Sequence, residues 1–256
     1  MLRSRVIPSL LLRDGGLVKT VRFANPKYVG DPLNAVRIFN EKEVDELIIS
    51  DISATVDQRE PDYRLISQIA SQCRMPLCYS GGITSLDQIQ RIIGLGVEKV
   101  GIGSAAISNP HLLEEASACV GSQSIVGILD VKKSGLFSRY QVVSHNSKRQ
   151  SGFSPADLAL KYQSLGAGEI LLVSVDRDGT MHGYDHTLIK LVRDAVSVPL
   201  SVLGGASSLQ DIRELVTRYG LIGAAAGSLF VFKGKYRAVL IQYPSSDEKL
   251  FLSAIR

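Results

Sequence analysis

The sequence predicts a single α/β barrel of eight parallel strands, from three observations: eight short apolar runs, helix-like segments between them, and a repeat at half the chain length. The runs are rich in Val, Ile and Leu at nearly every position, which is typical of parallel strands covered on both faces. Over 256 residues, eight runs give about 32 residues for each strand-and-helix unit. Eight such units fit one closed (β/α)8 barrel, a fold of roughly 250 residues.

The expected strands and two of the helices can be located directly. Two intervening segments carry apolar residues three and four positions apart, as amphipathic helices do: Ser85–Leu95 and Ser208–Val216. Each opens with a serine, a preferred N-cap residue. The N-terminal stretch lacks a small-residue cleavage site, so we interpret it as the first strand rather than as a signal peptide. The expected strands are Arg5–Leu12, Glu46–Asp51, Pro76–Ser80, Lys99–Ser104, Ser124–Asp130, Glu169–Val175, Pro199–Leu203 and Leu221–Ala226.

The second half of the chain repeats the first. SGGITSLDQIQRII at 80–93 matches LGGASSLQDIRELV at 203–216, and GIGSAA at 101–106 matches AAGSLF at 225–230. A shift near 124 residues predicts two four-unit halves, about 1–121 and 122–240, with a C-terminal tail at 241–256. We therefore expect one domain over 1–256, with two-fold half-barrel pseudo-symmetry and two similar sites at its mouth.

The composition argues against several classes of protein. The net charge is only +4 and no Lys/Arg run stands out, so we expect no nucleic-acid partner. No apolar stretch reaches the roughly 18 residues of a membrane span. Three cysteines without CxxC spacing indicate reduced thiols in a cytoplasmic protein. Four histidines without ligand spacing predict no metal, and nothing else suggests a cofactor.

Glycine pairs follow the third and seventh expected strands, and Gly-Ser pairs follow the fourth and eighth. Because the active sites of such barrels lie at the carboxyl ends of the strands, these loops should meet at the mouth. Glycine lets a backbone N–H approach an anion, and serine adds a hydroxyl donor. Paired glycines can also merely turn the chain, but two matching copies favour a phosphate cradle in each half. The expected phosphate-binding residues are Gly81, Gly82, Gly103, Ser104, Asp178, Gly204, Gly205, Gly227 and Ser228.

Aspartates at strand ends are candidates for acid–base chemistry. Asp130 follows the apolar run SIVGIL, where a buried charge is costly, and this favours a catalytic role. Its counterpart in the first half is Leu11, so the opposed carboxylates that symmetry suggests lack one member. For Asp51 and Asp178, a loop cap or an ion pair is an equally good interpretation. Lys19, in the first long loop, is a candidate for binding an anion, although a solvated lysine fits nearly as well.

The segment Leu136–Phe153 alternates polar and apolar residues after the fifth expected strand. This pattern predicts a flexible hairpin that could close over the site. Neither Gly-x-Ser-x-Gly nor the context of a catalytic cysteine occurs, so the chain is not expected to be a glutaminase itself.

Several stretches together resemble the cyclase subunit of imidazole glycerol phosphate synthase over about residues 1–232: RVIPSLLLRDGGLVKT, DELIISDISAT, NPHLL, GAGEILLVSVDRDGTMHGYD and GGASSLQDI. The resemblance implies two phosphate sites and a glutaminase partner on the N-terminal face of the barrel. It implies that ammonia crosses the core to a cyclisation reaction of histidine biosynthesis, with Asp130 and Lys19 as catalytic residues. It also implies a charged ring at the ammonia entrance, formed by Arg5, Glu46, Lys99 and Glu169.

The chain departs from the family pattern at the mouth. Leu11 stands where the family has its second catalytic aspartate, and Gly103, Val173 and Leu203 replace polar family residues. A methyl-tipped side chain cannot transfer a proton, and losing a general acid or base typically costs about 10²–10⁴-fold in rate. A cyclase with Leu11 is therefore expected to be badly impaired, while the entrance ring is kept.

This profile is similar to that of paralogues in clusters for bacterial surface polysaccharides, which serve a separate amidotransferase that makes acetamidino sugars. We therefore expect an ammonia conduit for lipopolysaccharide or O-antigen synthesis. Its expected partners are a glutaminase, a sugar amidotransferase and a phosphorylated small molecule. The alternatives are an active histidine-pathway cyclase, a scaffold that docks a glutaminase and conducts nothing, and an isomerase of the related half-barrel family. The isomerase also needs two opposed aspartates.

Overall fold

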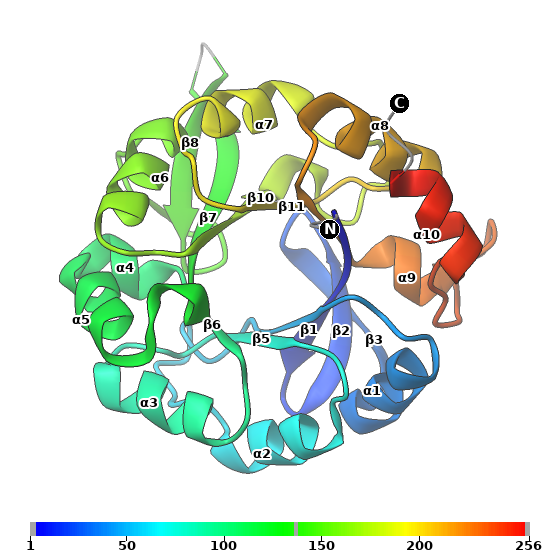
Figure 1. Ribbon diagram of the computed structural model, residues 1–256, viewed down its shortest axis with the longest axis horizontal. Coiled ribbons are helices and arrows are strands. Elements are labelled where there is room, and N and C mark those ends of the chain that lie inside the picture. Colours follow the sequence, from blue (N-terminus) through cyan, green and yellow to red (C-terminus); the bar gives the residue numbers. More distant parts are fainter. Residues whose placement is uncertain (1–3, 136–137, 254–256) are drawn as a thin grey trace.

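The computed structural model describes residues 4–135 and 138–253, and eight parallel strands in it close into a barrel ringed by helices (Figure 1). The sheet runs in the order β10-β11-β12-β1-β4-β5-β6-β7, and β10 also pairs with β7, which closes it. The predicted (β/α)8 barrel is thus confirmed. The barrel strands are β1 (Arg5–Arg13), β4 (Leu47–Asp51), β5 (Leu77–Ser80), β6 (Lys99–Ile102), β7 (Ile125–Ser134), β10 (Glu169–Ser174), β11 (Leu200–Leu203) and β12 (Gly223–Ala226).

Each expected strand overlaps an observed one, and the largest differences lie at carboxyl ends. β1 and β7 run past their expected ends because they leave the barrel and pair antiparallel with β2 (Gly16–Val21) and β8 (Arg139–Ser144). β2 continues to β3 (Ala24–Gly30), and β8 pairs with the short β9 (Arg149–Gln150). The expected carboxyl end of the fourth strand, Ser104, was wrong. The observed strand β6 ends at Ile102, and Ser104 begins a helix.

The helices fill the segments between the strands and pack on the outside of the barrel (Figure 1). Both located helices are confirmed, with Ser85 and Ser208 as N-caps, and Ser208 forms a capping box with Asp211. Such caps satisfy N–H groups that have no partner inside the helix. The helices are α1 (Pro32–Glu41), α2 (Tyr63–Gln72), α3 (Leu86–Gly94), α4 (Ser104–Ser108), α5 (His111–Val120), α6 (Pro155–Ser164), α7 (His186–Arg193), α8 (Leu209–Tyr219), α9 (Ser228–Val231) and α10 (Ser246–Ser253), with 3-10 turns η1 (Ser122–Ser124) and η2 (Val175–Arg177).

The two halves present matching backbone at the mouth. Gly81 and Gly204 have φ angles of 114° and 111°, values that favour glycine over any other residue. Gly103 and Gly227, which precede the short helices α4 and α9, have φ angles of −110° and −103°. The first strand of each half also ends in an antiparallel hairpin. The exact division of the chain into two halves and a C-terminal tail remains a prediction. Residues 1–3, 136–137 and 254–256, which belong to these predicted segments, lie outside the described residues.

Hydrophobic residues form an outer core between sheet and helices and a smaller core inside the barrel. The outer core holds large, fully buried side chains such as Phe39 and Tyr162, each of which contributes on the order of 1.5–3 kcal/mol by leaving water. Within residues 4–135 and 138–253, no helix combines the length and hydropathy needed to cross a membrane. The inner core consists of Ile7, Ile48, Cys78, Val126, Leu171, Val173 and Ala225.

Candidate functional site

A pocket opens at the carboxyl ends of the barrel strands, and Leu11 and Asp130 both line it. Leu11 pairs with Ser50 on β4, and Asp130 pairs with Val173 on β10. Burial raises the pKa of Asp130 to about 7, and the nearby Asp178 carboxylate adds to the rise. Asp130 can therefore hold or release a proton near neutral pH, which is what a general acid or base needs. Leu11 can do neither.

The wall around Asp130 is largely apolar. Val173 and Leu203 line the pocket together with Ile128 and Leu171. Phe23, from the turn between β2 and β3, lines it as well. Sequence reasoning missed Phe23 because a single aromatic residue in a hairpin turn carries no periodic pattern. These apolar side chains surround the Asp130 carboxyl, and among the described residues that line the pocket none is a lysine or an arginine.

The glycine loops of the first half line a neighbouring pocket. The fold brings four of the predicted phosphate-binding residues together in this pocket: Gly81, Gly82, Gly103 and Ser104. A Cβ on Gly81 would lie 2.2 Å from the carbonyl oxygen of Asp51, so only glycine fits there. These residues leave a polar, backbone-lined hollow of the kind that holds an anion.

Arg59 adds a cation to this first-half pocket, and the sequence did not reveal it. The guanidinium donates to Ser53 Oγ at 2.8 Å and lies 3.9 Å from the Asp51 carboxylate. Asp51 itself accepts from the backbone N–H groups of Ser53 and Ala54 at 2.9 and 3.0 Å. The side chain of Asp51 is therefore a loop cap that also positions Arg59, which supports one of the two interpretations left open.

The glycine loops of the second half form a separate pocket with Lys19. Gly204, Gly205, Gly227 and Ser228 line it. Lys19 is 6% exposed on β2, and its Nζ donates to the carbonyl oxygen of Ser9. The alternative of a solvated loop lysine was wrong, because the β2–β3 hairpin folds Lys19 inward. Burial lowers the pKa of Lys19 to about 8, while the Asp178 carboxylate acts in the opposite direction.

Asp178 lines both the mouth pocket and this second-half pocket. Its Oδ2 accepts from Thr20 Oγ1 at 2.7 Å and from the Phe23 N–H at 3.2 Å. Its carboxylate thus fastens the β2–β3 hairpin to the barrel mouth. A direct contact between Asp178 and a phosphate remains a prediction.

The hairpin predicted over Leu136–Phe153 lies over the mouth, except for residues 136–137, which are outside the described residues. His145 and Asn146, at its turn, line the mouth pocket. Asn146 Nδ2 donates to the carbonyl oxygen of Ile52 at 2.6 Å, and the His145 N–H donates to Ser104 Oγ at 3.4 Å. In this structure the hairpin is therefore fastened to the segments that follow β4 and β6.

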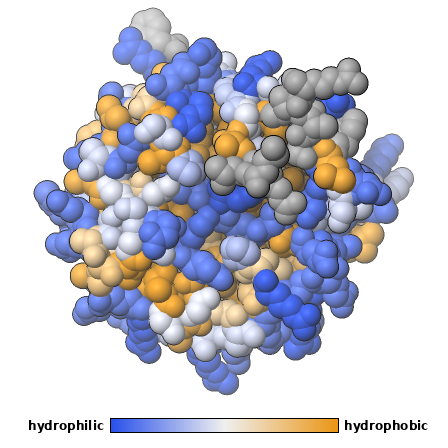
Figure 2. Space-filling model, viewed as in Figure 1, coloured by the Kyte–Doolittle hydropathy of each residue, from blue (hydrophilic) through white to orange (hydrophobic). Residues whose placement is uncertain are grey.

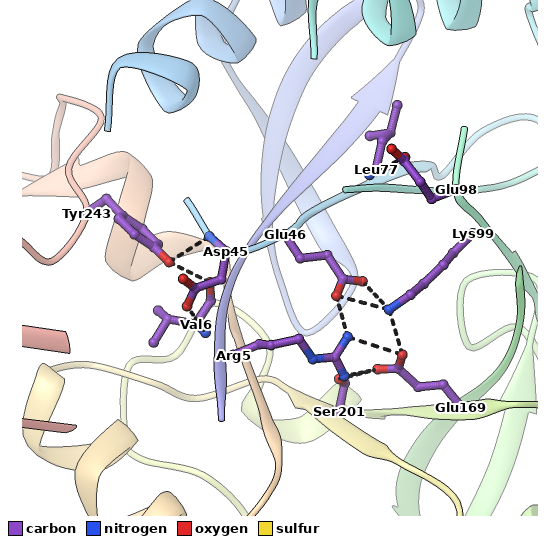
Figure 3. Close-up of polar contacts among 10 residues, drawn as sticks. All are labelled: Arg5, Val6, Asp45, Glu46, Leu77, Glu98, Lys99, Glu169, Ser201 and Tyr243. Atoms are coloured by element: carbon purple, nitrogen blue, oxygen red, sulfur yellow. Dashed lines mark hydrogen bonds and ion pairs between the residues drawn. The ribbon is translucent and has the colours of Figure 1, made fainter. Parts of the chain in front are cut away.

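At the amino ends of the strands, four charged side chains form the predicted ring (Figure 3). Lys99 Nζ lies 3.0 Å from Glu46 and 2.9 Å from Glu169. Arg5 Nη2 lies 2.7 Å from Glu169, and Nη1 contacts Glu46. Figure 2 shows hydrophilic side chains at the centre of the face on which the N-terminus lies, with hydrophobic patches around them.

The charges of the ring are paired, because Glu46 and Glu169 each form ion pairs with both Arg5 and Lys99. Burial alone would raise the pKa of Glu169, but the hydrogen bond and charge of Arg5, followed by those of Lys99, hold it below its usual range. Glu169 is therefore ionised at neutral pH in this arrangement, and the inner hydrophobic core lies between the ring and the mouth. Among the described residues, no group of three or more His, Cys, Asp or Glu side chains is placed to hold a metal ion.

A family model described as "Histidine biosynthesis protein" matches residues 5–237. The chain belongs to this HisF-like family. Relatives from Leptospira interrogans and Pseudomonas aeruginosa, provisionally named as imidazole glycerol phosphate synthase subunits HisF and hisF2, are 53% and 50% identical over 249 and 248 residues. Each alignment covers 97% of this chain and 98% of the relative. The imidazole glycerol phosphate synthase subunit HisF of Bacillus pumilus is 39% identical over 233 residues, 91% of this chain and 92% of its own.

The two ends of the HisF-like barrel carry different sets of residues: charged side chains at the amino ends of the strands, and the pocket of Leu11 and Asp130 at the carboxyl ends. The ring of Arg5, Glu46, Lys99 and Glu169 is complete, and both glycine-loop pockets are formed. At the mouth, the position opposite Asp130 in the repeat holds Leu11.

Proposed function

We propose that this chain is an ammonia-channelling subunit that pairs with a glutaminase and supplies an amidotransferase making acetamidino sugars for lipopolysaccharide or O-antigen. The observation that carries the proposal is the pairing of an intact entrance ring with Leu11 at the mouth. Selection for conduction alone would keep the first feature and tolerate the second. The proposed place of action is the cytoplasm.

The interior of the barrel supports conduction of neutral ammonia. Ile7, Ile48 and Val126 belong to the apolar layer beyond the ring. An ammonium ion would lose its hydration there at a high cost in free energy, whereas neutral ammonia would lose far less. The ring can hold ammonium back and pass ammonia, because its own charges are already paired.

The glutaminase is proposed to dock on the face that carries the ring. Relatives of this chain are named as synthase subunits, which supports a partner. A glutaminase active site over the ring would release ammonia directly at Lys99 and Glu46. At the other end, the glycine-loop pockets are proposed to bind a phosphorylated small molecule.

The second candidate function is cyclisation in histidine biosynthesis. It is favoured by Asp130, whose pKa near 7 suits a general acid or base, and by the Bacillus pumilus relative. This function requires Asp130 to act alone or with another carboxylate, such as the exposed Asp14.

Two measurements separate the candidates. The purified chain with its glutaminase should turn over the histidine-pathway nucleotide at a background rate, and it should not restore growth without histidine to a strain lacking the cyclase. Robust cyclase turnover would overturn the proposal. With the sugar amidotransferase added, glutamine should drive amidination.

A variant of the ring tests conduction directly. Lys99→Met should lower the glutamine-driven rate of amidination and leave the rate driven by added ammonium chloride unchanged. Lys132→Met, on the exposed part of β7, removes the same charge far from the ring and is the matched control. An equal glutamine-driven rate in the folded Lys99→Met protein would instead support a scaffold that conducts nothing.

A further inference from the structure

A short hairpin after the last barrel strand returns the chain to the second-half pocket. Its strands are β13 (Phe232–Lys233) and β14 (Ala238–Val239), which pair antiparallel. Arg237 lies at the end of the turn between them, with its guanidinium 4.6 Å from the centre of the Phe232 ring. This cation–π contact limits the positions that the long side chain can take.

The guanidinium of Arg237 reaches two residues that line the second-half pocket. Its Nη2 donates to Ser228 Oγ at 3.3 Å and to the carbonyl oxygen of Gly179 at 3.5 Å. Ser228 and Gly179 both belong to the pocket lining. Arg237 therefore lies at the outer rim of the pocket, beside the Ser228 hydroxyl, which the sequence predicts to bind phosphate.

The inner end of the same pocket carries a buried cation and a buried hydroxyl. Lys19 Nζ reaches so close to Gly227 that a Cβ there would lie 2.6 Å away. The Ser9 hydroxyl is buried, lines the pocket, and has no hydrogen-bond partner among the described residues. A buried polar atom without a partner is costly, and a ligand in the pocket would remove that cost.

One acid, Asp178, also lines the pocket, and its charge favours the protonated form of Lys19. Its Oδ2 accepts from Thr20 Oγ1 and from the Phe23 N–H. Lys27, 6.0 Å from the Phe232 ring centre, adds a third positive charge on the same side. The pocket thus has donors at both ends, a lysine inside and an arginine outside.

We infer that Arg237 is an anion-binding residue of the second-half pocket, and that it acts with Lys19 to hold the phosphate of a phosphate monoester. A planar guanidinium can donate two parallel hydrogen bonds to phosphate oxygens, and Lys19 supplies a point charge behind them. The inference rests on the proposed phosphate pocket. It does not depend on where the ammonia goes.

The test is a titration of the ¹⁵N-labelled full chain with sn-glycerol 3-phosphate, followed by NMR. The amides of Gly205 and Gly227 report on this pocket, and those of Gly82 and Ser104 report on the first-half pocket. Arg237→Gln should raise the Kd measured at Gly205 and Gly227 about tenfold, as expected for loss of a charge-assisted contact. Arg237→Lys should fall between Arg237→Gln and the unchanged chain.

Two comparisons keep the outcomes distinct. Lys235→Gln removes one charge from the exposed turn of the same hairpin and should change the Kd by less than about twofold, since exposed charges are screened. The Kd at Gly82 and Ser104 should be unchanged in Arg237→Gln, and unaltered shifts elsewhere show that the variant is folded. Equal binding by Arg237→Gln, or an equal loss in Lys235→Gln, would overturn the inference. If the unchanged chain shows no shifts at Gly205 and Gly227, the phosphate pocket itself is wrong and the inference fails with it.

Discussion

Leu11 and Asp130 occupy equivalent places in the barrel, each where the first strand of a half leaves the sheet and enters a hairpin. Leu11 pairs with Val18 on β2, and Asp130 pairs with Val143 on β8. Both line the mouth pocket. The backbone that would present a second carboxylate is therefore in place, and only the side chain is missing.

Leu11→Asp should restore part of a cyclase. The new carboxylate would enter the mouth pocket and give Asp130 a partner in proton transfer, so turnover of the histidine-pathway nucleotide should rise by about 10²-fold. Steady-state assays with ammonium chloride measure this rise without the glutaminase. Leu11→Asn, which has nearly the same shape as Asp but no comparable acidity, is the control and should show no rise. No gain in a folded Leu11→Asp protein would mean that the apolar wall also prevents the reaction.

Asp130 should make the stability of the protein depend on pH. Burial raises its pKa to about 7 in the folded chain, against about 3.9 in an unfolded one. Between these values the folded state holds a proton that the unfolded state has released. The contribution of Asp130 to stability should therefore fall as pH rises, by at most about 1.4 kcal/mol per pH unit.

Urea unfolding of the wild type and of Asp130→Asn from pH 5 to pH 8 measures this effect. The free energy of unfolding of the wild type, relative to that of Asp130→Asn, should decrease as pH rises and level off above pH 7. Asp14→Asn, an exposed substitution, should leave the pH dependence as it is. A difference between wild type and Asp130→Asn that does not vary with pH would contradict the assignment.

Much of the barrel could be predicted from the sequence, because fully apolar runs and capped amphipathic segments each follow from local rules. The ends of β1 and β7 were not predicted, since Arg13 and Ser134 belong to strands through antiparallel pairing with β2 and β8. The same hairpins explain why the burial of Lys19 was left open and why Phe23 was missed. Whether a residue in such a hairpin is buried depends on how the hairpin packs on the barrel, which the local sequence does not indicate.

The site was predicted best where a motif occurs twice. The glycine loops and the ring residues met as expected, because strand ends meet at one face of a parallel barrel. Arg59 and Arg237 could not be found in this way, since neither belongs to a motif that occurs twice in the sequence. Their placement depends on contacts with Ser53 and Ser228 that only the folded chain shows.

Lys99→Met should strongly destabilise the protein at neutral pH. It leaves Glu46 and Glu169, with side chains only 5% and 8% exposed, to share Arg5 alone. Removing one partner of a buried ion pair typically costs about 3–5 kcal/mol. Because the folded pKa of Glu169 is held below its unfolded value, the stabilisation is present at neutral pH and is lost as pH falls through the folded pKa.

Urea unfolding at pH 7 and pH 4 tests whether the stabilisation by the ring decreases as pH falls. The loss of stability in Lys99→Met should be largest at pH 7 and smaller at pH 4, because a Glu169 carboxyl that takes up a proton needs no cationic partner. Lys99→Arg should recover most of the stability, and Lys132→Met should match the wild type. A larger loss at pH 4 than at pH 7 would show that the ring is not held by its charges.

Tyr243→Phe should loosen the backbone beside the ring. The Tyr243 hydroxyl donates to the Val6 carbonyl at 2.8 Å and accepts from the Asp45 N–H at 3.1 Å, and these residues directly adjoin Arg5 and Glu46 (Figure 3). The variant keeps the ring packing against Phe230, whose centre lies 5.5 Å away, but it leaves two backbone groups short of a partner. We expect a loss of about 1–3 kcal/mol in the free energy of unfolding.

Hydrogen exchange locates the effect of Tyr243→Phe. The amide of Asp45 should exchange faster, because its acceptor is gone, whereas amides in the opposite half of the barrel should slow or quicken only with global stability. Tyr236→Phe, at a side chain that is 90% exposed, is the matched control and should change neither stability nor exchange. If Asp45 exchange in Tyr243→Phe rises no more than that of distant amides, the C-terminal segment stabilises the barrel as a whole and does not position the ring.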